Sequence, residues 1–342
     1  MKKVLLGTSA LVAAGLIAGP AAAQLELGIS GDVYMELGYV SEDDDAATDR
    51  DYGSRTDANL TFNAAGTAEN GLRYGGRIVI EGLEGGDGDD GGETWVTVSG
   101  GFGTVVAGEE DGASSLLRIT PPGAGTGVLD GSYAGYVGGG SILDFDTADT
   151  GDANKIVYTT DGTALDNFGV TLGASWAPAA EGRGSARSQA ERTQSAGDGP
   201  DNVISLGARY SGNFGAASFG ISGGYVFGEG APGSEDHSAY QIGAEVGFGA
   251  FTVGGMWVDN DDSVVAAGDD TSLIFGAAFS QGPWDFAAQI GFGESGDTDE
   301  TSFGVGATYE LAPGLTAHAD AVIFDNDAND GFVGIGRLKA AF

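Results

Sequence analysis

The feature that most constrains this chain is an alternation of apolar and polar residues, repeated in short runs from residue 25 to the last residue. In LELGISGDVYMELGYV, the odd positions from Leu25 to Tyr39 are apolar or glycine, whereas the even positions include Glu26, Asp32 and Glu36. A period of two places neighbouring side chains on opposite faces of a strand and excludes a helix of this length. The same pattern recurs in further runs, including 58–64, 168–176, 204–210, 240–248, 284–292 and 303–309. The chain is therefore predicted to be all-β.

The connections between these runs also alternate in length. Seven short connections alternate with eight long ones rich in Asp and Gly, and the longest is 108–153; the strands that they imply number sixteen. Each run is long enough to cross a bilayer as a tilted strand of about 9–11 residues. A soluble β-sandwich would also alternate, but it has no reason to place every long loop at one end. The pattern thus predicts a sixteen-stranded antiparallel transmembrane β-barrel.

The N-terminal segment has the features of an export signal. Lys2 and Lys3 precede an apolar stretch, and Ala21 and Ala23 form an A-x-A pattern typical of a signal-peptide cleavage site. A transmembrane anchor is the alternative, but small residues and Pro20 interrupt the stretch. We therefore predict a signal peptide at residues 1–23 and a single barrel domain at 24–342.

Composition excludes several classes of function. There are 50 acidic and only 14 basic residues, and the formal net charge is −36. Binding nucleic acid requires cationic surface, so such a partner is not expected, and cations are the favoured small ions. The acidic residues also keep exposed loops solvated. The absence of cysteine excludes disulfides, thiolate metal sites and a cysteine nucleophile.

Alternation also assigns charged residues to the barrel interior. Arg73 and Arg77 fall on the inward face of the third strand, and Arg55 lies on the polar face of the strand before it. The arginines could simply pair with neighbouring carboxylates and hold a loop down, or they could set an electric field in the pore; both roles are compatible. Four more cations fall on inward positions near strand ends and are expected to be rim or terminus-pairing charges: Lys155, Arg209, Arg337 and Lys339.

Catalytic and metal-binding patterns are weak. His237 lies in a long loop, and His318 lies two residues from Asp320 on an inward face, without a nucleophile pattern. We therefore expect no enzymatic activity and no required cofactor. The acidic loops are suited to weak calcium binding, with Glu109 and Asp111 as the candidate ligands.

The order of these features resembles the general diffusion porins of Gram-negative outer membranes, especially the acidic, glycine-rich alphaproteobacterial branch. The resemblance rests on the signal peptide, the sixteen runs, GGFGTVVAGEEDG before the longest loop, KIVYTT after it, and the terminal Phe342. It implies a homotrimer of water-filled barrels in which the third long loop, 108–153, folds inward to narrow the pore. It also implies a constriction with Arg55, Arg73 and Arg77 on the wall, facing acidic residues of the loop: Glu109, Glu110, Asp111, Asp130, Asp144, Asp146, Asp149 and Asp152.

The C-terminal run FVGIGRLKAAF alternates to its last residue. It is predicted to be the sixteenth strand, which closes the barrel against the first strand. In the porin family, a C-terminal aromatic residue resembles the signal that the barrel-assembly machinery reads. By this resemblance, Phe342 is expected to have a second role, in assembly of the barrel.

The predicted function is passive diffusion of ions and small hydrophilic solutes across the outer membrane, with a preference for cations. The alternative is a non-transporting barrel that acts as an acidic calcium-binding or adhesion protein at the cell surface.

Overall fold

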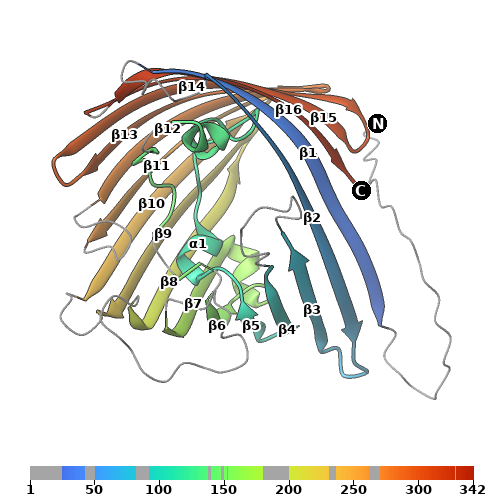
Figure 1. Ribbon diagram of the computed structural model, residues 1–342. Helices are drawn as coiled ribbons and strands as arrows, with labels where there is room; N and C mark the ends of the chain where they lie inside the picture. Colours follow the sequence, from blue (N-terminus) through green and yellow to red (C-terminus); the bar gives the residue numbers. More distant parts are fainter. Residues whose placement is uncertain are drawn as a thin grey trace.

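The computed structural model describes residues 25–42, 51–81, 92–137, 140–147, 150–151, 153–179, 200–230, 236–261, 270–327 and 329–342. Sixteen antiparallel strands form one closed barrel in which each strand pairs with its neighbours in the sequence and β1 pairs with β16 (Figure 1). The strands are β1 Glu26–Glu42, β2 Tyr52–Thr67, β3 Arg73–Ile80, β4 Thr94–Gly100, β5 Gly103–Glu109, β6 Asn154–Thr159, β7 Val170–Ala179, β8 Asp201–Phe214, β9 Ala217–Glu229, β10 His237–Phe248, β11 Phe251–Asp261, β12 Asp270–Gln281, β13 Trp284–Ser295, β14 Thr298–Ala312, β15 Leu315–Asn326 and β16 Asn329–Ala341. The predicted fold is confirmed.

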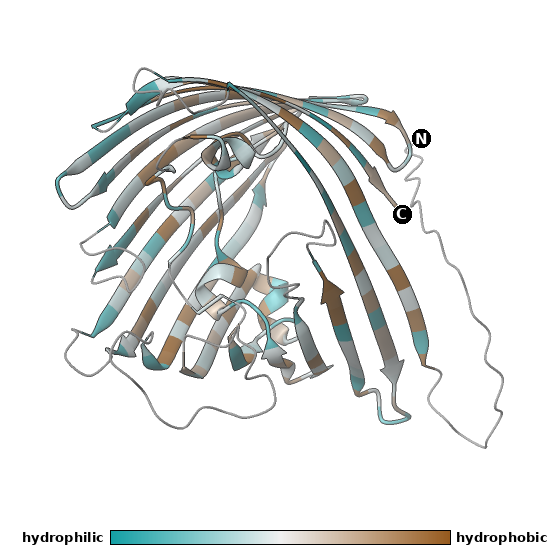
Figure 2. Ribbon diagram, viewed as in Figure 1, coloured by the Kyte–Doolittle hydropathy of each residue, from teal (hydrophilic) through white to brown (hydrophobic). Residues whose placement is uncertain are grey.

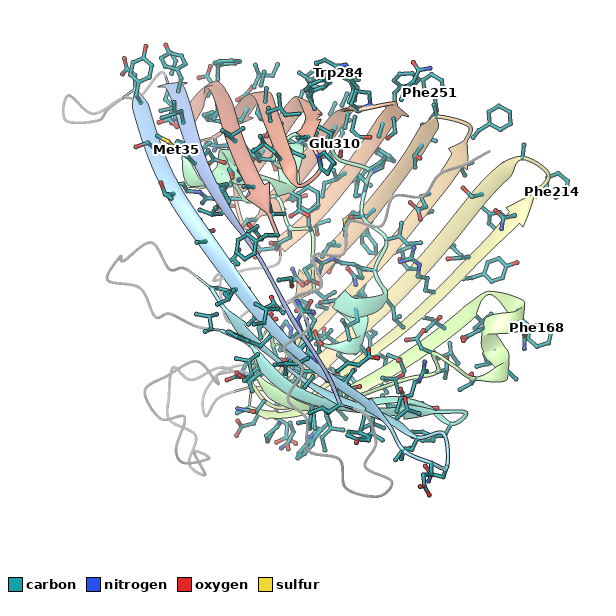
Figure 3. The ribbon with its side chains drawn as sticks, turned by 90° about the vertical axis from the view of Figure 1, so that its right-hand side faces the viewer. Met35, Phe168, Phe214, Phe251, Trp284 and Glu310 are labelled. Atoms are coloured by element: carbon teal, nitrogen blue, oxygen red, sulfur yellow. The ribbon has the colours of Figure 1, made fainter. Side chains whose placement is uncertain are left out.

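Apolar side chains cover the outside of the barrel. Hydrophilic and hydrophobic bands alternate along many of the strands (Figure 2), and large apolar residues such as Leu37 and Phe248 are exposed by 57% and 65%. Side chains such as Phe168 and Phe214 project away from the barrel (Figure 3). A surface of this kind needs a hydrocarbon solvent, and the closed sheet leaves no strand edge unpaired within it.

Aromatic residues pack together near the short-turn end of the barrel. The ring centroids of Trp284 and Tyr309 lie 4.4 Å apart, and those of Phe251 and Phe279 lie 4.8 Å apart. Such pairs at strand ends fit an aromatic girdle at the membrane interface.

Two connections are shorter than the sequence pattern predicts. The expected long loops at 293–299 and 325–330 are instead tight turns, since β13 ends at Ser295 and β14 begins at Thr298, while β15 and β16 are separated by only 327–328. Gly296 has φ +58° and supplies the left-handed backbone of the first turn. Asp and Gly mark tight turns as well as long loops, so composition alone did not separate the two.

The β1–β16 seam closes in the predicted way. Eleven residue pairs run from Asp32–Ala341 to Glu42–Gly331. Beyond them, Gly31 and Phe342 exchange backbone hydrogen bonds, each 2.9 Å long. The Phe342 side chain is 60% exposed, as expected for a lipid-facing residue at the end of the strand.

The wall is uneven in height. β1 and β2 have 17 and 16 residues, whereas β3, β4, β5 and β6 have only 8, 7, 7 and 6. With a rise of about 3.3 Å per residue and a tilt near 45°, an eight-residue strand advances by about 19 Å along the barrel axis. That is less than the roughly 25 Å of an outer-membrane apolar band.

Helical structure is confined to connections. α1 (Ala113–Leu117) and the 3₁₀ turns η1 (Val128–Asp130) and η2 (Ser132–Gly135) lie between β5 and β6, and η3 (Ala164–Phe168) lies between β6 and β7. None of the helices in the described part of the chain is long and apolar enough to cross a membrane. The predicted signal peptide lies outside the described residues.

Candidate pore constriction

The connection between β5 and β6, residues 110–153, is called the inner loop below, and its described residues lie inside the barrel. Its first part, with α1, packs against β7, β8 and β9. Three of its backbone amides donate to inward-facing serine hydroxyls on these strands. The pairs are Ala113–Ser175 at 3.1 Å, Ser114–Ser205 at 2.8 Å and Ile119–Ser222 at 2.8 Å. Serines spaced around the wall thus satisfy backbone donors that would otherwise be buried without partners.

Longer polar side chains hold the next part of the inner loop. The Gln289 amide on β13 accepts from the Leu129 backbone at 2.9 Å and donates to the carbonyl of Pro122 at 3.2 Å. On β15, Asp320 accepts from both the backbone and the hydroxyl of Thr126. The inner loop therefore follows the wall from β7 round to β15.

The returning part of the inner loop has its own anchors. Glu300 on β14 is buried, and it accepts from the Ile142 amide at 2.8 Å and from the hydroxyls of Tyr133 and Ser141. The Asp144 amide then donates to Ser272 of β12 at 2.8 Å. Both passes of the loop are thus tied to the same side of the barrel.

Glycine on the wall allows this close contact. A Cβ atom at Gly224 would lie 2.0 Å from the Ser114 hydroxyl oxygen, and one at Gly243 would lie 2.0 Å from the Ile119 carbonyl oxygen. Real Cβ atoms cannot approach so closely, so only glycine fits beneath the loop at these two positions. Part of the unusual content of 64 glycines therefore serves the packing of the inner loop on the wall.

Apolar side chains between the inner loop and the wall form a small core inside the barrel. Val128, Leu129 and Tyr133 of the loop pack in one cluster with wall residues that include Met256, Val258, Ile274, Val322, Phe324, Val333 and Ile335. The sequence pattern predicted polar inward faces, and on these strands that expectation was wrong at several positions. The reason is that the inner loop, rather than water, covers them.

The tip of the inner loop, defined here as residues 132–137, reaches β1, β2 and β16. The Ser132 hydroxyl accepts from Arg55 at 3.1 Å and also from Arg337. The Tyr136 hydroxyl donates to Glu36 at 3.1 Å. Glu36 is fully buried and pairs with Arg337 at 2.6 Å and with Arg55 at 3.4 Å. Burial and the Glu36 carboxylate raise the pKa of Tyr136 to about 12, which keeps its hydroxyl protonated as a donor.

The inward faces of β3 and β4 have a different character and are called the open wall. They border a cavity of about 810 Å³ that is lined by Arg73, Arg77, Trp95 and Glu110, together with Glu26, Asn63, Thr97 and Ser99. The Arg77 guanidinium lies over the Trp95 ring, 4.9 Å from its centroid. Among the described residues, no carboxylate lies within 4.0 Å of the charged groups of Arg73 or Arg77. These two cations therefore face the cavity.

The three predicted basic residues do not form one cluster. Arg77 is level with Asn63 on β2, and Arg55 lies eight residues farther along that strand, about 26 Å away. Arg55 instead joins Arg337, and their guanidinium carbons lie over the Tyr34 ring, 5.5 and 4.1 Å from its centroid. The pairing of Glu36 with both Arg55 and Arg337 across the seam follows from strand register, which a count of alternation along single strands does not provide.

The predicted acidic residues of the inner loop divide into two groups. Asp146 binds Arg118 and accepts from Ser115 at 2.6 Å, and Asp144 accepts from Asn260 at 3.0 Å, so both hold the loop in place. Asp130 is exposed at the end of η1.

Glu109, Glu110 and Asp111 lie where the inner loop leaves β5, beside the open wall. Burial raises the pKa of the Glu110 carboxyl and also that of the nearby Glu93. Asp149 and Asp152 lie outside the described residues.

Sequence reasoning missed Glu36, Arg118 and Trp95 as parts of this region. Alternation places Glu36 and Trp95 inward, which was a usable signal, but a tryptophan in a water-filled barrel is unexpected. Arg118 gave no signal because nothing in the sequence showed that the loop would pair with itself. The described residues contain no group of three side chains suited to holding a metal ion.

Comparison with solved structures shows the same fold. The anion-selective porin from Comamonas acidovorans superposes with a TM-score of 0.66 at 18% identity, covering 93% of this chain and all of that one. A loop-deletion mutant of the Vibrio cholerae outer-membrane protein OmpT gives 0.63 at 13% identity, covering 93% and 99%. A variant of the Rh. blastica porin gives 0.64 at 19% identity, covering 93% and 100%.

The sequence comparisons give the family. No curated protein sequence matched the chain. The model of the Gram-negative porin family matches residues 7–329, which is most of the chain. The chain is therefore a member of the Gram-negative porin family and an outer-membrane β-barrel.

Proposed function

We propose that this porin passes ions and small hydrophilic solutes by passive diffusion along the open wall. The observation that carries the proposal is the 810 Å³ cavity with Arg73, Arg77 and Glu110 in its lining, on the side of the barrel that the inner loop does not cover. Arginine side chains that no carboxylate of the described residues neutralises at close range need water around them. Diffusion along such a path needs no catalytic group.

The experiment that tests the proposal is conductance in a planar bilayer. We expect stepwise, ohmic current from the purified protein. A protein that inserts into the bilayer but gives no conductance steps would contradict the proposal and favour the non-transporting surface protein.

We further propose that cations are preferred. The support is the excess of carboxylates beside the open wall, where Glu26, Glu93 and Glu110 accompany Arg73 and Arg77, together with the net charge of −36. In a potassium chloride gradient, the reversal potential is expected to have the sign of potassium selectivity. The opposite sign would mean that the two arginines dominate the path.

A homotrimer is proposed as the assembled form. The supporting feature is the low wall at β3–β6, whose strands are too short to span the apolar band alone. A neighbouring barrel at this sector would shield it from lipid, and its outer face carries aliphatic residues such as Ile78, Val96 and Ile156. Mass measurement of the detergent-solubilised protein by light scattering tests the trimer, and a monomeric mass would contradict it.

Three further expectations remain proposals. Calcium binding at Glu109 and Asp111 is tested by calorimetric titration of the whole protein. Removal of residues 1–23 is tested by the intact mass of the exported protein. Recognition of Phe342 by the barrel-assembly machinery is tested by deleting this residue, which is expected to reduce insertion more than the conductance of the barrels that do insert.

A further inference from the structure

The tip of the inner loop binds to strands from both ends of the chain. Ser132 accepts from Arg55 on β2 and from Arg337 on β16, and Tyr136 donates to Glu36 on β1. β1 and β2 are neighbours along the chain, but β16 joins them only when β1 pairs with β16. A barrel with an open seam offers only part of this docking site.

Apolar contacts at the tip have the same dependence. Tyr133 and Val137 belong to the cluster that contains Val333 and Ile335 of β16, and Val40 of β1 packs against it. The Tyr136 ring lies over the first two strands, because a Cβ atom at Gly38 would be 2.2 Å from it and one at Gly53 would be 2.8 Å from it. The tip therefore covers the seam from inside.

The first part of the inner loop, with α1, provides a contrast. The anchors of α1 are Ser175, Ser205, Ser222 and Gln241 on β7–β10, four strands that are consecutive in the sequence. That docking site can form before the first and last strands meet. The first part of the inner loop and its tip thus differ in whether they require a closed barrel.

We propose that the tip of the inner loop is a latch on the β1–β16 seam, which docks only on the closed barrel and then resists reopening. Glu36 makes this coupling specific, because its buried carboxylate binds Arg337 of β16, Arg55 of β2 and the loop Tyr136 at once. By linkage, a contact that requires closure stabilises closure by the same free energy. The pore consequently takes its final shape after the seam has formed.

Local opening of the seam can be measured by amide hydrogen exchange with mass spectrometry on the whole protein in detergent. The test variant is Ser132→Ala/Tyr136→Phe, with Tyr136→Phe alone as a milder version if the double variant folds poorly. We expect at least tenfold faster exchange in peptides from β1 and β16 and less than a twofold change in peptides from β8 and β9. The matched control is Ser114→Ala, which removes the α1 hydroxyl that accepts from Gln241 of β10 at 2.8 Å and should leave exchange at the seam unchanged.

A disulfide engineered between β1 and β16 supplies the second part of the test. Met35 and Leu338 are paired across β1 and β16 and lie on the outer face, away from the inner loop. Since the chain has no cysteine, Met35→Cys/Leu338→Cys would form the only disulfide; Leu37→Cys/Gly336→Cys is an alternative pair.

With the seam covalently closed, the faster exchange caused by the tip variant should disappear. The proposal is overturned if the tip variant leaves exchange at the seam unchanged, if β8 and β9 accelerate equally, or if the acceleration persists after the disulfide has formed.

Discussion

The two sides of the barrel interior are built from different residues. Under the inner loop, the wall has Gly224, Gly243 and short serines such as Ser205, which allow the backbone of the loop to approach. The open wall has Arg73, Arg77 and Trp95 instead. Both sides alternate in the same way along the strands, so alternation alone does not distinguish the wall beneath α1, with its small inward residues, from the wall that faces the cavity.

The largest effect is expected from filling the space beneath the inner loop. Gly243→Val places side-chain atoms where the Ile119 carbonyl lies, so the loop must move off the wall toward the open wall. Overpacking of this kind typically costs about 1–3 kcal/mol. We expect a severalfold lower single-channel conductance and a lower unfolding temperature, measured in bilayers and by thermal denaturation. Gly336→Val is the matched control, because a Cβ there meets nothing within 4 Å, and equal effects of both variants would contradict the comparison.

The next effect concerns the charges of the open wall. Arg73→Gln/Arg77→Gln removes two cations that face the cavity, so the preference for potassium over chloride should increase severalfold in reversal-potential measurements. Arg209→Gln is the control, because Arg209 already lies 3.5 Å from Glu245 and is largely neutralised by it. Selectivity that responds to Arg209→Gln and not to the double variant would place the ion path on the other side of the barrel.

A smaller effect should appear with pH. Burial raises the pKa values of Glu93 and Glu110, so on acidification these carboxyls become neutral before ordinary glutamates do. Glutamate ordinarily titrates near pH 4.5, so the cation preference should begin to weaken at a pH above that value. Glu93→Gln/Glu110→Gln is expected to remove this first step in a pH series of reversal potentials. A step that persists in the double variant would show that other acids produce it.

The smallest effect is expected at the end of the seam. Lys339 and Asp32 form an ion pair at 3.1 Å that is partly exposed. Pairs of this kind contribute about 0.2–1 kcal/mol. Lys339→Gln should lower the unfolding temperature only slightly, and less than Gly243→Val does. A decrease larger than that of Gly243→Val would mean that this pair stabilises the barrel as much as the buried ion pairs of Glu36 with Arg55 and Arg337.

The sequence was sufficient to predict the barrel, because the bilayer and the need to close the sheet leave few possible folds. The number of strands, the pairing of β1 with β16 and the position of Phe342 all followed from the alternation of apolar and polar residues. A one-residue shift of a strand would turn each of its side chains to the opposite face and destroy this pattern. The tight turn at Gly296 could not be separated from a long loop, because the same residues favour both.

The candidate site was harder to predict because it depends on register and on the course of one long loop. Arg55 and Arg77 share an inward face in the pattern but are far apart in space, since β2 extends well beyond the end of β3. Arg337 joins Arg55 only through the closed seam. The roles of Asp144 and Asp146 in holding the loop depend on contacts between distant residues, which alternation does not contain.

We propose that the open wall borders the water path and that the wall beneath the inner loop does not. The absence of cysteine allows a direct measurement with single cysteines at Thr97, which lines the cavity, and at Ser205, which is buried beneath α1. During current recording, a charged thiol reagent should change the conductance of Thr97→Cys within minutes and leave Ser205→Cys unaffected. Rapid modification of Ser205→Cys, with Thr97→Cys unaffected, would contradict the account.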